Sequence, residues 1–438
     1  MGYDLSKSHF ADVTARVPMT AELSRTTRRQ ILASGLFLLA RLGLGATRTS
    51  QATPAHRNSS VEYGQTTLPA GIRSRRIDTN NQVVLHTLEA GFETPGRPCV
   101  VLLHGFPELA YIWRHQMLPL AQAGFHVIAP DVRGYGLSAP GPVAYDDSLV
   151  PYSMLNRVSD VLGLVRAMGH EKVALVVGHD WSGPTAQWCA RLRPDVFQSV
   201  ISVSTPFLFA PTLPLDSAAH PGLSEPKVDL DQALAALPRP RKHYATYSAT
   251  REANPDMWHA PQGIHNLLRQ MFYFKSADWA GNQPYPLKSK TAAELAKIPT
   301  YYIMDLNKGI AATMAEHQPP PSYIAACQWM TEADLEVFAS QFTRTGFQGG
   351  LNYYRVDSDP ALEGEIKSFA GKTIDVPACY IAGGREWGAY QSPGAFETMD
   401  KKCTQLKGIH LVPHAGHSVV EEQPEAVNRI LLEFLRQV

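Results

Sequence analysis

Short apolar runs rich in β-branched residues recur along the chain from residue 99 onward. They are Cys99–Leu103, His126–Ala129, Val173–Val177, Val200–Val203, Ala378–Ile381 and His410–Val412. Runs of this length without polar alternation are typical of strands buried on both faces. Helical stretches such as Tyr152–Met168 and Pro184–Leu192 lie between them. The alternation predicts an α/β fold with a mostly parallel, doubly wound sheet.

Two regions depart from this pattern. Before the first run, Arg73–Ile77 and Gln82–Leu88 flank a turn-forming Asp-Thr-Asn-Asn segment, which predicts a β-hairpin. Between the fourth and fifth runs lies an insertion, roughly residues 207–355, rich in Pro, Trp and Tyr. Because a structureless loop of that length is not expected inside a compact domain, we predict a helical cap there. The core would then comprise residues 70–206 and 356–438.

The N-terminal segment has the pattern of an export signal. The pair Arg28-Arg29 precedes the apolar stretch Ala33–Ala40, which is too short to span a bilayer, and small residues follow it. This predicts a twin-arginine signal over residues 1–52, a polar linker over residues 53–69 and an exported protein. The alternative is a basic amphipathic helix or tail on a cytoplasmic protein.

The composition and net charge limit the classes of binding partner that we expect for the protein. Of the 438 residues, 44% are hydrophobic and 18% charged, which is enough apolar material for a large core. Forty basic and forty acidic side chains give a formal net charge of zero, so the sequence lacks the field that recruits nucleic acid or an anionic membrane. The five cysteines show no CxxC or metal-ligand spacing, and we expect mostly buried thiols. We therefore expect a small-molecule substrate of low charge and no stable membrane span.

Candidate chemistry begins where the third apolar run ends. Val173–Val177 leads into the hexapeptide Gly178–Gly183, GHDWSG, and a helical stretch follows. A strand, a sharp turn flanked by small residues and a helix form a nucleophile elbow, here with Asp180 at its tip, and the chain has no G-x-S-x-G serine version. A carboxylate is ionised at neutral pH and displaces a leaving group from an sp³ carbon without a base, which frees a histidine for a later step. The alternative is that Asp180 only caps the helix.

Several motifs follow one another along the chain. They are His104–Pro107, Asp131–Ser138, Gly178–Gly183, Gly346–Arg355, and His414–His417 followed by Glu421–Pro424. In type and order they resemble the motifs of the epoxide hydrolase branch of the α/β-hydrolase superfamily, and the resemblance extends from about residue 70 to the end. It implies an α/β-hydrolase fold with an inserted cap. It also implies hydrolysis of a small apolar epoxide to a diol, without cofactor or metal.

The resemblance assigns roles in the core. His417 matches the catalytic base and is favoured over His414, because the family's Gly-His pair falls on residues 416–417. Glu386 stands where the family carries the acid that orients the histidine, although the family more often has Asp there. Backbone N–H groups of Phe106 and Trp181 match those that hold the oxyanion.

The cap is expected to supply hydrogen-bond donors for the epoxide oxygen. Tyr354, in the segment NYYR, falls on the family's cap tyrosine. Tyr247 is the second candidate, with Tyr244 and Tyr353 as adjacent rivals, and each of these tyrosines has an alternative interpretation as a packing residue.

Two other functions fit the same core residues. A haloalkane or haloacid dehalogenase uses the same Asp, His and acid, but its halide needs indole or amide N–H donors in place of phenols. Trp258, Trp279 and Trp329 of the cap are candidates for lining an apolar pocket. A non-catalytic binder on the same fold is less favoured, because no member of the triad is missing. A metal site at His414 and His417 would need further ligands that the local sequence does not supply.

Overall fold

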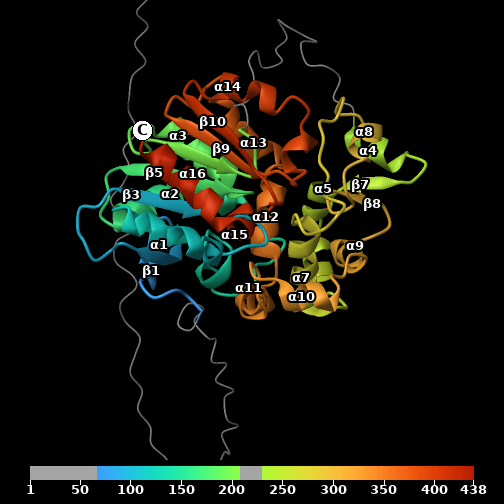
Figure 1. Ribbon diagram of the computed structural model, residues 1–438. Coiled ribbons are helices and arrows are strands. Elements are labelled where there is room, and N and C mark those ends of the chain that lie inside the picture. Colours follow the sequence, from blue (N-terminus) through green and yellow to red (C-terminus); the bar gives the residue numbers. More distant parts are fainter. Residues whose placement is uncertain (1–66, 208–228) are drawn as a thin grey trace, which may run out of the picture. The chain divides into compact units, whose positions relative to one another are not determined.

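A computed structural model describes residues 67–207 and 229–438 (Figure 1). The predicted signal over residues 1–52 lies outside the described residues, as does the linker up to residue 66. Residues 208–228 of the predicted cap lie outside them as well.

One eight-stranded sheet forms the centre of the described fold. Its strands are β1 (Arg73–Asp78), β2 (Val84–Ala90), β3 (Cys99–Leu103), β4 (His126–Pro130), β5 (Val173–His179), β6 (Val200–Val203), β9 (Ala378–Gly383) and β10 (Leu406–Val412). The order across the sheet is β1-β2-β4-β3-β5-β6-β9-β10. The hairpin β1–β2 is antiparallel and β2 pairs antiparallel with β4, whereas all the other pairs are parallel. The structure confirms the predicted hairpin and the mostly parallel sheet.

Helices cover both faces of the sheet. The core helices are α1 (Arg114–Gln122), α2 (Met154–Ala167), α3 (Ser182–Leu192), α13 (Pro360–Lys367), α14 (Met399–Lys402), α15 (Val419–Glu422) and α16 (Pro424–Leu435). Short 3₁₀ helices span Ala110–Trp113, Gly136–Ser138, Val150–Tyr152, Gly388–Gln391 and Phe396–Thr398. Along β3, Val100 and Leu102 belong to the hydrophobic cluster that includes α1 and α16, whereas Val101 and Leu103 belong to the cluster with α2 and α3. This alternation, with both faces buried, explains why the strand sequences lack polar positions.

The last strand corrects one expectation. Residues 410–412 were predicted as a strand buried on both faces, but β10 is longer and lies at the edge of the sheet. Ile409 and Leu411 are 40% and 43% exposed there. A strand at the edge of a sheet has a neighbouring strand on one side only and is less covered by the rest of the fold. An apolar sequence there does not imply that the side chains are buried.

The insertion between β6 and β9 forms the cap (Figure 1). Its helices are α4 (Leu230–Ala235), α5 (Tyr244–Ser248), α6 (Ala253–Trp258), α7 (Gly263–Lys275), α8 (Ala292–Leu295), α9 (Ile310–Ala315), α10 (Pro321–Ala326), α11 (Glu332–Thr345) and α12 (Gln348–Val356). The cap is not purely helical as predicted, because β7 (Arg241–His243) and β8 (Ile303–Asp305) pair as a short antiparallel sheet. No helix among residues 67–207 and 229–438 is long and apolar enough to cross a membrane.

Candidate active site

Asp180 lies at a sharp turn between β5 and α3. Its φ of +48° is in the left-handed region, which costs a non-glycine residue conformational energy and is held by the surrounding structure. Gly178 permits this turn, because a Cβ there would lie 2.0 Å from the carbonyl oxygen of Ser182. The Oδ1 of Asp180 accepts a 2.9 Å hydrogen bond from the backbone N–H of Phe106. The carboxylate therefore projects from the carboxyl end of β5 in a fixed direction.

A histidine and a glutamate complete the cluster. The Nδ1 of His417 lies 2.6 Å from Oε1 of Glu386, and its Nε2 lies 3.5 Å from Oδ2 of Asp180. Both side chains are buried, at 5% and 3% exposure. The rival His414 is exposed at a turn, and Asp375, before β9, is exposed and accepts a hydrogen bond from Thr373. The structure brings together the three side chains that the sequence singled out.

A second buried acid–histidine pair lies beneath this cluster and was not anticipated from the sequence. Nδ1 of His179 is 2.7 Å from Oε2 of Glu108, and its Nε2 is 2.9 Å from the backbone carbonyl oxygen of His417. With an acceptor at each nitrogen, both ring nitrogens donate. Burial opposes the charge of His179, but the Glu108 carboxylate outweighs it and raises the pKa of His179 to about 9.

This pair ties the elbow to the loop of the catalytic histidine. Glu108 directly follows the HGFP motif, and His179 lies within the GHDWSG motif, directly before Asp180. Ser204 donates a further hydrogen bond of 3.0 Å to the same carbonyl oxygen of His417. A titratable residue directly before the predicted nucleophile is the sequence signal that indicates this pair.

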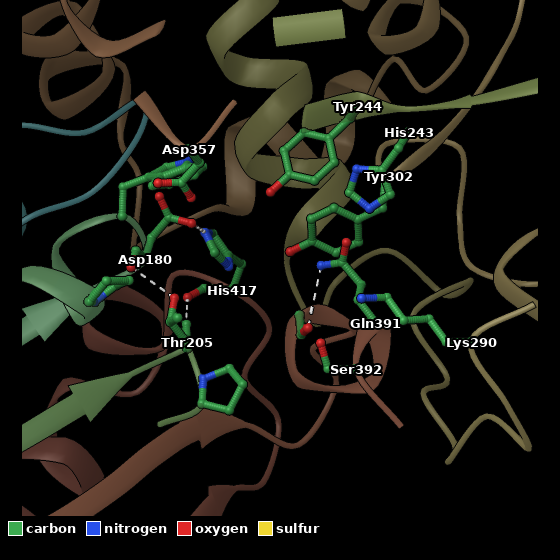
Figure 2. Close-up of a pocket in the computed structure, with 15 residues that line it drawn as sticks. Asp180, Thr205, His243, Tyr244, Lys290, Tyr302, Asp357, Gln391, Ser392 and His417 are labelled. Carbon is green, nitrogen blue, oxygen red and sulfur yellow. Dashed lines mark hydrogen bonds and ion pairs between the residues drawn. The ribbon is translucent and has the colours of Figure 1, made fainter. Parts of the chain in front are cut away.

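A cavity of about 310 Å³ opens onto Asp180 and His417 (Figure 2). Its floor includes Trp181 and Thr205, and Thr205 donates a 2.8 Å hydrogen bond to the backbone oxygen of Asp180. The rest of the lining combines polar and apolar residues. It is formed by Pro184, Ser204, Pro206, His243, Tyr244, Lys290, Tyr302, Asp357, Gly388, Gln391 and Ser392.

The cap tyrosines are arranged differently from the expectation. Tyr244, and not Tyr247, lines the cavity, and Figure 2 shows its phenol directed toward Asp180 and His417. Tyr247 lies one turn further along α5, where Lys242 covers its ring at 4.2 Å. Burial and the neighbouring Asp256 carboxylate raise the pKa of Tyr247. Residues three apart on a helix differ by only about 60° in direction, so helix periodicity alone does not separate the two tyrosines, and the contact of Tyr247 with Lys242 distinguishes them.

Tyr354 is where the family motif suggested, next to the nucleophile. Its ring packs edge-on against Trp181, with centroids 4.5 Å apart, and against Phe106 at 5.6 Å. The ring of Tyr244 lies 5.8 Å away. Burial, followed by the charge of Asp180 for Tyr244 and by the neighbouring Tyr244 for Tyr354, raises the pKa of both phenols. Both remain protonated at neutral pH and can therefore donate hydrogen bonds.

The cap tryptophans do not line this cavity. Trp258 and Trp329 donate their indole N–H groups to the Thr343 carbonyl oxygen and to Asp278, whereas Trp279 packs on Phe274. The indole at the cavity belongs to Trp181 of the core. In the described part of the chain, no group of three or more His, Cys, Asp or Glu side chains is arranged to hold a metal ion.

A carboxylate on a nucleophile elbow, with a buried His-Glu pair at the ends of neighbouring strands, defines a hydrolase of the α/β type. Residues 98–424 match the family model for the alpha/beta hydrolase fold. Epoxide hydrolase A of Mycobacterium tuberculosis is 33% identical over 370 residues, covering 82% of this chain and 96% of that protein. The crystal structure of epoxide hydrolase A from Mycobacterium thermoresistibile has a TM-score of 0.64 and 30% identity, over 83% of this chain and 98% of that one. An epoxide hydrolase from an endophytic Streptomyces has a TM-score of 0.66 and 28% identity, over 84% and 96%.

These matches show that the chain belongs to the epoxide hydrolase branch of the α/β-hydrolase family. The fold and the family resemblance expected from the sequence are thereby confirmed.

Proposed function

We propose that this enzyme opens a small epoxide through a covalent ester on Asp180. The observation that carries the proposal is the pairing of Asp180 with the Tyr244 phenol across the cavity. The carboxylate attacks the less hindered ring carbon, and the breaking C–O bond leaves its electron pair on the oxygen. Tyr244 and Tyr354 donate hydrogen bonds to that oxygen, which needs them because it becomes an alkoxide.

His417 acts in the second step. Its Nε2 has no hydrogen-bond partner among the described residues and lies 3.5 Å from Oδ2 of Asp180, which suits a base that activates a water molecule. The deprotonated water attacks the carbonyl carbon of the ester, and Glu386 stabilises the resulting imidazolium. The N–H of Phe106 already bonds Oδ1 of Asp180, and with the Trp181 N–H it holds the oxyanion. Collapse of the intermediate releases the diol and restores the carboxylate.

The ester is tested by removing the base. His417→Gln is expected to alkylate but to hydrolyse the ester slowly, so mass spectrometry of the protein will find it heavier by one substrate molecule. In the unaltered enzyme, one turnover in ¹⁸O-water with enzyme in excess is expected to place the label in Asp180. Label chiefly in the diol of that first turnover would mean direct attack by water, with Asp180 as a base.

Dehalogenation is the second candidate, and one observation favours it. The indole of Trp181 lies beside the nucleophile at the cavity, and its N–H is a donor that could hold a halide. The phenol of Tyr244 at the cavity supports the epoxide instead. Assaying the same enzyme with matched alkyl epoxides and alkyl halides decides between them, because halide release without diol formation would reverse the assignment.

We also propose that the protein is exported. The support is the twin-arginine pattern at residues 28–29 with the short apolar stretch behind it. Fractionation of cells expressing the full chain is expected to recover protein that lacks about the first 52 residues outside the cytoplasm. Intact protein confined to the cytoplasm, unchanged by Arg28→Lys with Arg29→Lys, would contradict export.

A further inference from the structure

Lys275, the last residue of α7, is a buried lysine without an obvious partner. It is 8% exposed, and within the described residues its ammonium has neither a hydrogen-bond acceptor nor an ion pair. Its closest contacts of this kind are aromatic faces, with Nζ 5.3 Å from the ring centre of Tyr302 and 5.8 Å from that of Tyr244. A lysine that is largely buried without such partners loses much of its hydration, so packing alone does not explain a lysine at this position.

The main chain at Lys275 is fixed to the loop of the catalytic histidine. The carbonyl oxygen of Lys275 accepts a 3.0 Å hydrogen bond from the N–H of His417. Two residues on, the N–H of Ala277 donates to Oε2 of Glu422 at 2.8 Å, and the N–H of Gly416 donates to the same oxygen at 2.8 Å. The backbone of Lys275 is therefore fixed against the loop that carries His417.

The two rings connect Lys275 with the cavity. Tyr244 and Tyr302 are neighbours, with centroids 5.0 Å apart, and both line the cavity that Asp180 and His417 enter (Figure 2). Lys275 does not itself line that cavity, and the two rings are its contacts with residues that do.

The charged groups around Lys275 are carboxylates. Burial lowers the pKa of Lys275, while Asp180, Glu386 and Glu108 favour its protonated form. Asp180 is the group whose charge changes during the proposed reaction. When the ester forms, the carboxylate becomes neutral and a negative charge appears on the oxygen that faces the cap.

We propose that Lys275 is a positioning residue for ring opening, in which its ammonium acts through the Tyr244 and Tyr302 rings to stabilise negative charge moving toward the cap. This inference rests on the function proposed above. As the bond from Asp180 to carbon forms and the carbon–oxygen bond of the epoxide breaks, the oxygen takes the proton of the Tyr244 phenol. The phenolate that results is protonated again after ester hydrolysis, by the proton that the regenerated Asp180 carboxyl releases through water. An ammonium near the ring stabilises the phenol while it shares its proton with the epoxide oxygen, and also the phenolate after the proton has moved. In both states the positive charge attracts the electron density added to the ring.

Lys275→Met tests the charge while keeping the length of the side chain. In single turnovers with an alkyl epoxide, ester formation is expected to slow roughly tenfold or more, whereas hydrolysis of the formed ester changes by less than about twofold. Lys275→Arg, which keeps a cation, is expected to recover most of the lost rate. The melting temperature of Lys275→Met should be unchanged or higher, because a buried unpaired charge has been removed.

Lys242→Met is the matched control. It removes a lysine ammonium from the ring of Tyr247, a tyrosine that does not line the cavity, and it should leave ester formation unchanged. The pH profile adds a second readout. Because the pKa of Lys275 is lowered and those of Tyr244 and Tyr302 are raised, ester formation should decline at alkaline pH before the phenols ionise, and Lys275→Met should lack this decline.

Two results would overturn the inference. One is ester formation by folded Lys275→Met within twofold of the unaltered enzyme, and the other is an alkaline decline that persists in that variant. If Lys275→Met does not fold, Lys275→Gln compared with Lys275→Arg decides, since equal rates would exclude a role for the charge. Failure of the unaltered enzyme to form an ester with any epoxide would instead refute the proposed function.

Discussion

The core and the cap hold their active-site groups by different means. In the core, hydrogen bonds fix each direction, as the N–H of Phe106 does for Asp180 and as Glu386 does for His417. In the cap, Tyr244 and Tyr354 are positioned mainly by packing between aromatic rings. Hydrogen bonds restrict angle and distance, whereas ring packing fixes position and restricts the direction of the hydroxyl less.

This difference matches the chemistry expected of each region. Ester hydrolysis has the same geometry whatever the substrate, so a rigid arrangement of base, acid and oxyanion donors suits it. Ring opening involves an oxygen whose place depends on the substituents of the epoxide. Phenols on short cap helices accommodate this variation, and the cap should therefore determine which epoxides react.

The largest effect is expected in the core, at Glu386. Glu386→Gln should slow ester hydrolysis by a factor on the order of 10⁴, because an imidazolium without its carboxylate is neither oriented nor stabilised. Ester formation should persist, so the covalent species will accumulate in rapid-quench mass spectrometry. Glu397→Gln, at an exposed glutamate of the 3₁₀ helix Phe396–Thr398, is the control. Equal loss of both steps would show that Glu386 supports the fold rather than His417.

Removing the cap phenols should have a smaller effect, and on the other step. Tyr244→Phe and Tyr354→Phe are each expected to reduce ester formation by about a hundredfold, the usual cost of one donor to a developing oxyanion. Hydrolysis of the ester should be unaffected. Tyr247→Phe, one turn along α5, is the matched control and should retain full activity by stopped-flow measurement. If Tyr247→Phe is the slow variant, the assignment of Tyr244 is wrong.

The same difference explains what could be predicted from the sequence. Asp180 and Glu386 each follow a buried strand closely and His417 follows the edge strand β10, so an apolar run followed by a motif located all three. Their proximity then follows from the parallel sheet, since the carboxyl ends of the strands share one edge.

The cap sequence contains no comparable signal of a strand followed by a motif. Its helix α5 has five residues, too few for a hydrophobic period to show which of Tyr244 and Tyr247 faces inward. Lys275 and Tyr302 were missed for a related reason. Burial of a single lysine at a helix end depends on partners such as the His417 loop, which is far away in the sequence.

The smallest expected effect lies where the two regions join, at Glu422. Its Oε2 accepts N–H groups from Ala277 of the cap and Gly416 of the core, while its Oε1 is buried without a hydrogen-bond partner in the described residues. Burial raises the pKa of Glu422 to about 8, with Asp278 and Glu386 adding to the rise and the two N–H groups opposing it.

The sign of the pH effect follows from this shift. A carboxyl whose pKa is higher in the folded protein than in the unfolded chain binds more protons when folded. Its contribution to stability is complete below about pH 4.3, the ordinary range of glutamate, and is lost as the pH rises through about 8. Glu422→Gln keeps an oxygen for both N–H groups but does not titrate. The variant should therefore lose less stability than the unaltered protein between pH 5 and 9, by at least about 1 kcal/mol, in chemical unfolding at each pH. Glu425→Gln, at an exposed position of α16, is the control and should show the same pH dependence as the unaltered protein. If Glu422→Gln shows that same pH dependence too, the Glu422 carboxyl does not titrate in this range and the prediction is wrong.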